Sequence, residues 1–166
     1  GYLADKLGKK EIAGQYTQKA KEMAVEWERM ANDGDHYKLT FDKSGTWSQK
    51  YNLVWDKLMN WQIFPEQIVK TEIPYYLTKQ NRYGLPLDNR QTYTKTDWIM
   101  WTATLAPDKA TFEEFIEPVY LFMNETTDRI PMSDWVFTDK PEHRAFQARS
   151  VVGGYFIKML ENKMNN

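Results

Sequence analysis

The first hydrophobic pattern along the chain is helical. Between about residues 9 and 31, apolar side chains recur at steps of three and four, the spacing of one face of an α-helix. The turn-forming residues 32–35 end this pattern, and Gly34 offers the positive φ that such a stop commonly needs. The apolar positions are Ile12, Tyr16, Ala20, Met23, Trp27 and Met30. We therefore predict a long amphipathic helix over residues 9–31.

Five further helices follow from capping signals and turn residues. After a short extended segment at 37–41, Thr46 and Gln49 have capping-box spacing for a helix over about 47–61. The other four helices are expected at about 65–80, with Pro74 as a kink or break, and at 95–105, 111–124 and 146–163. Their predicted caps are Thr94 with Asp97, and Thr111 with Glu114. Residues 81–92 and 128–143 are predicted loops.

The pattern as a whole predicts an all-α fold of about six helices in three antiparallel pairs. We found no linker and no internal repeat, so residues 1–166 are treated as one helical domain. The long loops follow the first, third and fifth helices. In stacked hairpins they would gather at one end of the molecule, where binding sites are usually built.

Composition excludes several classes of function. The 22 Lys and Arg residues balance the 23 Asp and Glu residues, which argues against nucleic acid or an anionic membrane as partner. No apolar run approaches the ~20 residues needed to span a bilayer. There is no Cys and there are only two His, which argues against a thiolate or multi-His metal site. We predict no metal and no other cofactor, and a site made of carboxylates alone stays open. Aromatic residues make up 15 %, which suits a well-filled core but also a cleft for a sugar or another small molecule.

Three segments carry candidate chemistry, and the first is residues 45–57. If this segment is helical, Ser48, Asn52 and Asp56 lie at spacings of four beside an aromatic stripe. Asn52 and Asp56 could then form a polar site, or they could pair with other helices or with a loop backbone. The Ser48-x-Lys50 pattern has a superficial likeness to Ser/Lys acyl-transfer motifs, a match that arises readily by chance.

The second segment, residues 83–98, leads into a predicted helix N-terminus, where anions are favoured. Arg90 could bind a substrate carboxylate there, or it could simply pair with Asp88. The third segment, residues 148–155, holds Gly153 and Gly154 inside a helical pattern, at a cost of about 1 kcal/mol each relative to Ala. Close approach of another helix is the favoured explanation for these glycines, and a ligand is the alternative.

These three segments read GTWSQKYNLVWDK, YGLPLDNRQTYTKTDW and ARSVVGG. Together they resemble the C-terminal region of the glutaminase A-like family, which includes secreted fungal glutaminases and Bacteroides-type proteins. The resemblance implies an (α/α)6 toroid, of which six helices would form half, with the remaining helices supplied by a longer protein. It also implies hydrolysis of L-glutamine to glutamate and ammonia in a periplasmic or extracellular location. The matching positions are Trp47, Lys50, Asn52, Asp56, Tyr83, Asp88, Arg90, Tyr93, Lys95, Asp97 and Arg149.

Amide hydrolysis needs a base, an oxyanion stabiliser and anchors for the charged ends of the substrate. We predict Asp56 or Asp88 as the base and Lys50 or Lys95 as the oxyanion stabiliser. Arg90 or Arg149 is the predicted anchor for the α-carboxylate. The other substrate-binding candidates are Trp47, Asn52, Tyr83, Tyr93 and Asp97.

Two other hypotheses stay open. The aromatic content and the toroid analogy would also suit a carbohydrate-binding or glycoside-hydrolase-like domain, in which two facing carboxylates would line an open groove. Alternatively, the chain is a structural half-domain without activity of its own. An isolated half-toroid would expose an apolar face and could form a homodimer through it.

Overall fold

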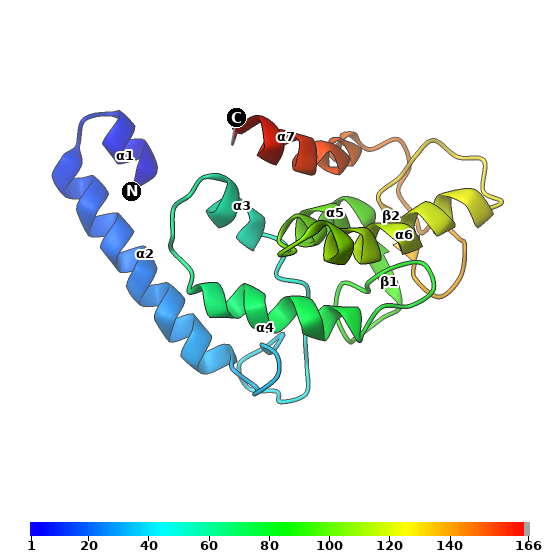
Figure 1. Ribbon diagram of the computed structural model, residues 1–166, viewed down its shortest axis with the longest axis horizontal. Helices are drawn as coiled ribbons and strands as arrows, with labels where there is room; N and C mark the ends of the chain where they lie inside the picture. The colour runs from blue at the N-terminus through cyan, green and yellow to red at the C-terminus, as the bar shows by residue number, and fades with distance from the viewer. Residues whose placement is uncertain (165–166) are drawn as a thin grey trace.

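The computed structural model describes residues 1–164, which are mostly helical (Figure 1). The helices are α1 (Tyr2–Lys6), α2 (Lys10–Ala31), α3 (Leu53–Leu58), α4 (Glu66–Leu77), α5 (Thr96–Thr104), α6 (Lys109–Glu125) and α7 (Ile157–Met164). A 3-10 helix, η1 (Ser150–Phe156), runs into α7, and two short strands, β1 (Tyr93–Lys95) and β2 (Trp135–Phe137), form a small sheet. The predicted helical fold class is confirmed, with this small sheet added.

Helix α5 lies at the centre of the structure (Figure 1). It packs against α6, η1, α7 and α3, and its residues Ile99 and Ala103 have no exposed surface. Helix α4 contributes Ile68, Ile73 and Tyr76 to the same apolar cluster. Burial of apolar surface is the main favourable contribution to folding, so this cluster holds the two helices together.

Helix α2 confirms the predicted first helix, but most of its apolar stripe is not a core face in this chain. Ile12, Tyr16 and Met23 are 42 %, 64 % and 63 % exposed. The reason is that the N-terminal half of α2 runs along the edge of the structure, where α1 packs against it (Figure 1). Only towards its C-terminal end does the helix meet the body, where Trp27 stacks on Tyr37.

The sheet replaces part of a predicted loop. Strands β1 and β2 pair antiparallel in the register Tyr93–Phe137, Thr94–Val136 and Lys95–Trp135. Thr94 and Val136 are fully buried at its centre. The Trp-Val-Phe run of β2 has the aromatic and β-branched composition of a strand, and the loop prediction for residues 128–143 overlooked it. In contrast, the extended segment predicted at 37–41 contributes only an isolated bridge between Tyr37 and Asn32.

The helix predicted over 47–61 is wrong at its start. Residues 46–52 lie mostly outside regular helix, and α3 begins only at Leu53. Thr46 Oγ1 donates to the Lys43 carbonyl instead of capping a helix. The Gln49 side chain is buried and donates to the carbonyl oxygens of Leu85 and Pro86. Tertiary hydrogen bonds of this kind override the local capping signal.

The other helix termini also differ from the predictions. Asp108, not Thr111, caps α6, because its carboxylate accepts from the Thr111 N–H at 2.8 Å. Thr94 lies in β1, and neither it nor Asp97 makes a side-chain cap on α5. Helix α4 continues through Pro74 without breaking into two pieces.

The C-terminal segment contains the two glycines in η1. A Cβ on Gly154 would lie 2.9 Å from Trp101 Nε1 and 3.0 Å from Asp97 Cβ, whereas a Cβ on Gly153 would meet nothing within 4 Å. Close approach of α5 therefore explains Gly154, as predicted, but not Gly153. The single helix predicted over 146–163 is replaced by η1 and the shorter α7.

Candidate functional site

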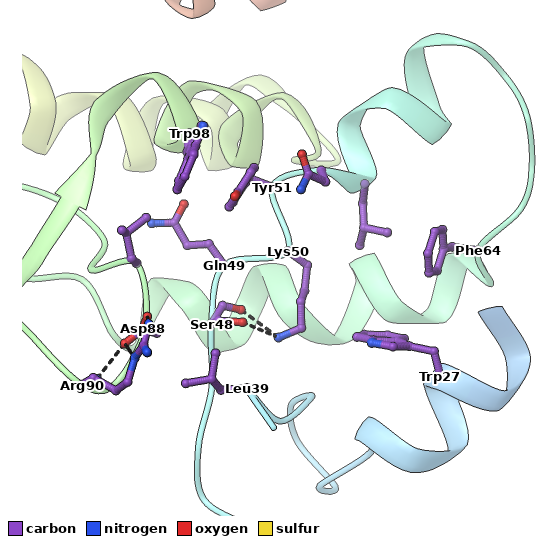
Figure 2. A pocket seen from close by; sticks show the side chains of 13 residues that line it. Trp27, Leu39, Ser48, Gln49, Lys50, Tyr51, Phe64, Asp88, Arg90 and Trp98 are labelled. Atoms are coloured by element: carbon purple, nitrogen blue, oxygen red, sulfur yellow. Dashed lines mark hydrogen bonds and ion pairs between the residues drawn. The ribbon is translucent and has the colours of Figure 1, made fainter. Parts of the chain in front are cut away.

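A hollow of about 440 Å³ lies where the two long motif segments meet (Figure 2). Its polar lining comes from residues 48–52 and 88–90, and its apolar lining from α2, from the loops and from α5. The lining residues are Trp27, Leu39, Ser48, Gln49, Lys50, Tyr51, Asn52, Leu53, Phe64, Leu87, Asp88, Arg90 and Trp98. We call this feature the Lys50 hollow. Its volume falls within the range of small-molecule sites.

Backbone pairing brings the two segments together. Ser48 and Asp88 form an isolated antiparallel bridge, with the Gln49 N–H donating to the Leu87 carbonyl at 2.8 Å. The buried Gln49 side chain strengthens the junction, because its carbonyl oxygen accepts from Thr102 of α5 at 3.0 Å. Residues some 40 positions apart in the sequence are thereby held on one wall of the hollow.

Lys50 turns back along its own segment, so that its ammonium group lies against Ser48 (Figure 2). Its Nζ is 3.0 Å from the Tyr37 carbonyl, 2.9 Å from the Ser48 carbonyl and 3.1 Å from Ser48 Oγ. None of these contacts is with a carboxylate. Burial lowers the pKa of Lys50, and the negative charge of Glu72 opposes that shift.

Glu72 lies behind Lys50 on α4 and is 1 % exposed. Its Oε1 accepts from the Tyr37 N–H at 2.6 Å. Burial raises the pKa of Glu72, with Lys50 acting in the opposite direction. Tyr76, one turn further along α4, accepts from the Lys50 N–H at 2.8 Å and donates to the Ser48 carbonyl at 2.9 Å. Sequence reasoning missed both residues, although Ile68, Glu72 and Tyr76 share one face of the helix at spacings of four.

Asp88 and Arg90 form an ion pair at the opposite side of the hollow (Figure 2). Asp88 Oδ1 accepts from Arg90 Nε at 2.9 Å, and Oδ2 accepts from Nη2 at 2.7 Å. Burial alone would raise the pKa of Asp88, but the bonds from Arg90 outweigh burial and hold that pKa below its ordinary value. The Arg90 side chain is 67 % exposed, so it keeps access to a ligand.

Asn52 and Asp56 do not form the buried polar pair that a helix over 47–61 would have made. Asn52 is exposed and lines the Lys50 hollow just before α3. Asp56 instead accepts from the backbone N–H groups of Ile63 and Phe64 at 3.0 Å each, which fixes the loop after α3. Both residues also line a second hollow of about 1090 Å³ beside α1 and α2.

Three other predicted residues meet around Asp134, at the sheet. Lys95 Nζ donates to Asp134 Oδ2 at 2.9 Å, and Arg149 Nη1 donates to the same oxygen at 3.3 Å. Asp134 is 2 % exposed, and sequence reasoning missed it because it lay in a predicted loop. Asp97 is 3 % exposed, and burial, followed by the Asp134 charge, raises its pKa to about 6. We call these four residues the Asp134 cluster.

Comparison with known proteins identifies a family and two relatives. Residues 1–159 match the glutaminase A six helical-hairpin domain. The chain belongs to this family. It is 27 % identical over 165 residues to glutaminase A of Aspergillus oryzae, covering 95 % of the chain and 24 % of that protein. It is 26 % identical over 174 residues to a probable glutaminase of Arthroderma benhamiae, covering 86 % of the chain and 20 % of that protein.

The chain thus spans about a quarter or less of the length of these curated relatives. No solved structure matches it. In this six helical-hairpin domain, the side chains of Ile12, Tyr16 and Met23 on α2 stay exposed although α1 packs against the helix, so the described residues leave much of this apolar stripe uncovered. This agrees with the chain being part of a larger protein.

The remaining predicted residues of this glutaminase A family domain lie outside the Lys50 hollow. Trp47 is 6 % exposed and packs against Tyr75 and Tyr76 in the core. Tyr83 is buried beyond α6, where its hydroxyl donates to Glu125 at 2.5 Å. Tyr93 packs edge-on against Trp135 across the sheet.

Within residues 1–164, no group of three or more His, Asp or Glu side chains is placed to hold a metal ion. No helix in this range has the length and apolar character to cross a bilayer.

Proposed function

We propose that the protein carrying this chain hydrolyses the side-chain amide of L-glutamine to glutamate and ammonia, with the Lys50 hollow holding the substrate. One observation carries the proposal. Four of the residues singled out from the sequence, Lys50, Asn52, Asp88 and Arg90, line one hollow of about 440 Å³. Membership of the glutaminase A family supports the same reaction.

The polar side chains that line the Lys50 hollow could bind the charged ends and the side chain of a free amino acid. Arg90 bonds Asp88 through Nε and Nη2, which leaves other guanidinium N–H groups for the α-carboxylate of the substrate. Asp88 stays ionised beside Arg90 and can accept from the α-ammonium group. Asn52 carries amide N–H donors that can bind the side-chain carbonyl oxygen of glutamine. Roles as ligand anchors therefore suit Asp88 and Arg90 better than a role as general base.

The glycan alternative has less support from the same hollow. Retaining and inverting glycosidases use two carboxyl groups that face each other across the scissile bond. Among the described residues that line the Lys50 hollow, Asp88 is the one carboxylate, and it is paired with Arg90. The stacked rings of Tyr51 and Trp98 also lie against each other at 4.1 Å, which leaves one face of each ring covered.

The test is ammonia release from L-glutamine by the full-length protein that carries this chain, with L-asparagine and a mixed oligosaccharide panel assayed in parallel. We expect ammonia from L-glutamine and no sugar release. Assaying the 166-residue chain beside the full-length protein separates a complete site from one shared with the remaining helices. Sugar release without ammonia would favour the carbohydrate hypothesis instead.

Arg90→Met tests the binding role. Loss of a charge-assisted contact to the α-carboxylate should raise KM by about tenfold or more, since such bonds contribute about 1.5–3 kcal/mol. Arg29→Met is the matched control, because Arg29 is an exposed arginine on α2 that pairs only with Glu26 among the described residues. An unchanged KM in Arg90→Met would remove Arg90 from the binding site.

The location and assembly of the protein belong to the same proposal. We place the protein in the periplasm or outside the cell, because the family resemblance implies an exported enzyme. The exposed apolar side chains of α1 and α2 would be covered by the remaining helices of the full-length protein. If the 166-residue chain is produced alone, dimerisation through this face stays a prediction, which sedimentation across a concentration series would test.

A further inference from the structure

Ser48 and Lys50 form a close pair on the wall of the Lys50 hollow. Ser48 Oγ and Lys50 Nζ are 3.1 Å apart, and both residues line the hollow (Figure 2). The bridge between Ser48 and Asp88 and the two bonds of the Tyr76 hydroxyl hold their backbone in place. The Ser-x-Lys pattern, which by itself carries little weight, is thus brought into hydrogen-bonding geometry by the fold.

The contacts of Lys50 suit a neutral amine as well as an ammonium ion. A neutral amine has two N–H groups and one lone pair. The N–H groups can donate to the carbonyl oxygens of Tyr37 and Ser48, at 3.0 and 2.9 Å. The lone pair can then accept the hydroxyl proton of Ser48 without any side chain moving. A lysine that changes protonation state in place is what a general base requires.

We infer that Ser48 is the nucleophile of the amide hydrolysis and that Lys50 is the general base that takes its proton. This inference rests on the proposed function, which it deepens by naming the covalent chemistry. Serine is a weak nucleophile until an adjacent base activates it, and the signature of such activation is a base within about 2.6–3.2 Å of the hydroxyl. The Ser48–Lys50 distance meets that criterion.

The surroundings of the pair favour this role. Burial lowers the pKa of Lys50. Glu72 and Tyr76 face it from α4, and the negative charge of Glu72 only partly opposes the effect of burial on the pKa of Lys50. Tyr37 contributes its carbonyl and, through its N–H, holds Glu72. Across the hollow, Asp88 and Arg90 neutralise each other and leave little net charge to act on Lys50.

The reaction proceeds in two balanced halves. Ser48 Oγ attacks the amide carbon of glutamine while its proton passes to Lys50 Nζ, and the carbonyl oxygen takes up the negative charge. The C–N bond then breaks, the proton moves from Lys50 to the departing nitrogen, and ammonia leaves. A glutamyl ester remains on Ser48. Water attacks this ester, its proton passes to Lys50 and then to Ser48 Oγ, and glutamate is released.

The experiment compares variants of the full-length protein in L-glutamine with and without hydroxylamine. Hydroxylamine intercepts an acyl ester and yields glutamyl hydroxamate alongside glutamate. We expect the wild-type protein to release ammonia and to form the hydroxamate. Ser48→Ala and Lys50→Met should each lower ammonia release by about a thousandfold or more, as loss of a nucleophile or its base commonly does.

Two further variants keep the result interpretable. Ser44→Ala is the matched control, because Ser44 is a nearby exposed serine whose hydroxyl bonds Asp33 outside the hollow, and it should keep wild-type activity. Ser48→Cys replaces the hydroxyl by a thiol in a segment that has no Cys of its own, and the wild-type full-length protein, treated with iodoacetamide in parallel, controls for cysteines elsewhere. Ser48→Cys should retain measurable hydroxamate formation and lose it on treatment with iodoacetamide, whether or not Ser48→Ala remains folded.

The outcomes separate the two claims. Ammonia release by Ser48→Ala within tenfold of the wild-type rate, or a Ser48→Cys variant indifferent to iodoacetamide, would overturn the Ser48–Lys50 assignment and leave the proposed function intact. A wild-type protein that releases no ammonia from L-glutamine would overturn the proposed function and this assignment together.

Discussion

The backbone N–H of Tyr37 donates a 2.6 Å hydrogen bond to Oε1 of Glu72, a residue that is 1 % exposed. This bond links the loop after α2 to α4 and places a buried carboxyl group behind Lys50. A buried donor that loses its acceptor costs about 1–3 kcal/mol. The Tyr37–Glu72 contact is therefore both a structural link and a source of electrostatic influence on the Lys50 hollow.

Substitutions at Glu72 should separate these two effects. Glu72→Gln keeps an oxygen acceptor for the Tyr37 N–H and removes the charge, so the pKa of Lys50 should fall further, because the Glu72 charge raises it. The acidic limb of the pH–rate profile should then move to lower pH. Glu72→Ala removes the acceptor and should lower the free energy of unfolding by about 2 kcal/mol or more. A Glu72→Gln profile identical to the wild type would contradict the electrostatic role.

Asp97 should destabilise the native state at neutral pH. Its pKa is raised to about 6 in the folded protein, against about 3.9 in an unfolded chain. A raised pKa favours the protonated folded form, so this contribution to stability is complete below about pH 4 and is lost as the pH rises through about 6. Asp97→Asn should therefore raise the free energy of unfolding at pH 7 by about 2–3 kcal/mol.

Thermal unfolding of the wild-type protein and Asp97→Asn between pH 4 and pH 7 checks this sign. The difference between the two proteins should grow with pH over that range. Asp108→Asn serves as a comparison, because the bond from the Thr111 N–H lowers the pKa of that exposed cap, so its contribution to stability is lost only as the pH falls below about 4 and this variant should show little pH dependence between pH 4 and pH 7. A difference between wild type and Asp97→Asn that is independent of pH would mean that Asp97 is not the titrating group.

Gly154 and Gly153 offer a matched pair. Alanine at Gly154 would place its Cβ 2.9 Å from Trp101 Nε1 and 3.0 Å from Asp97 Cβ, whereas alanine at Gly153 would meet nothing within 4 Å. We expect Gly154→Ala to cost about 1–3 kcal/mol, as overpacking usually does, and Gly153→Ala to be neutral or slightly stabilising. Chemical denaturation of the two variants measures both values, and equal effects would contradict the close packing of η1 on α5.

The Lys95–Asp134 ion pair should contribute more to the stability of the fold than surface ion pairs do. Asp134 is 2 % exposed and also accepts from Arg149, so Lys95→Met would leave a buried carboxylate with only the longer 3.3 Å bond. Removing one partner of a buried pair costs about 3–5 kcal/mol. Lys70→Met breaks the exposed Lys70–Glu66 pair of α4 and should have little measurable effect. Similar melting temperatures for both variants would show that the Asp134 cluster adds little stability.

Much of the fold was predictable from the sequence. The helix over residues 10–31 and the helical character of α4, α5 and α6 follow from apolar periodicity and turn residues, because these signals act within a few residues of chain. Gly154 could be predicted to allow close helix packing. The motif segments also contained Lys50, Asn52, Asp88 and Arg90, four residues that line the Lys50 hollow.

Tertiary structure decided the rest. Residues 46–52 carry a helix-capping signal, yet they extend along residues 87–89, since Gln49 satisfies buried carbonyl groups that no local structure could reach. The same pairing sets Ser48 against Lys50, and the buried face of α4 brings Glu72 behind them. Asp56 does not join them, because its carboxylate accepts a hydrogen bond from the backbone of the loop after α3. The sequence by itself thus determined which side chains were available, while contacts between distant segments decided which of them meet. The physical reason is that hydrogen bonds between segments distant in sequence depend on the packing of the whole chain, which no local pattern encodes.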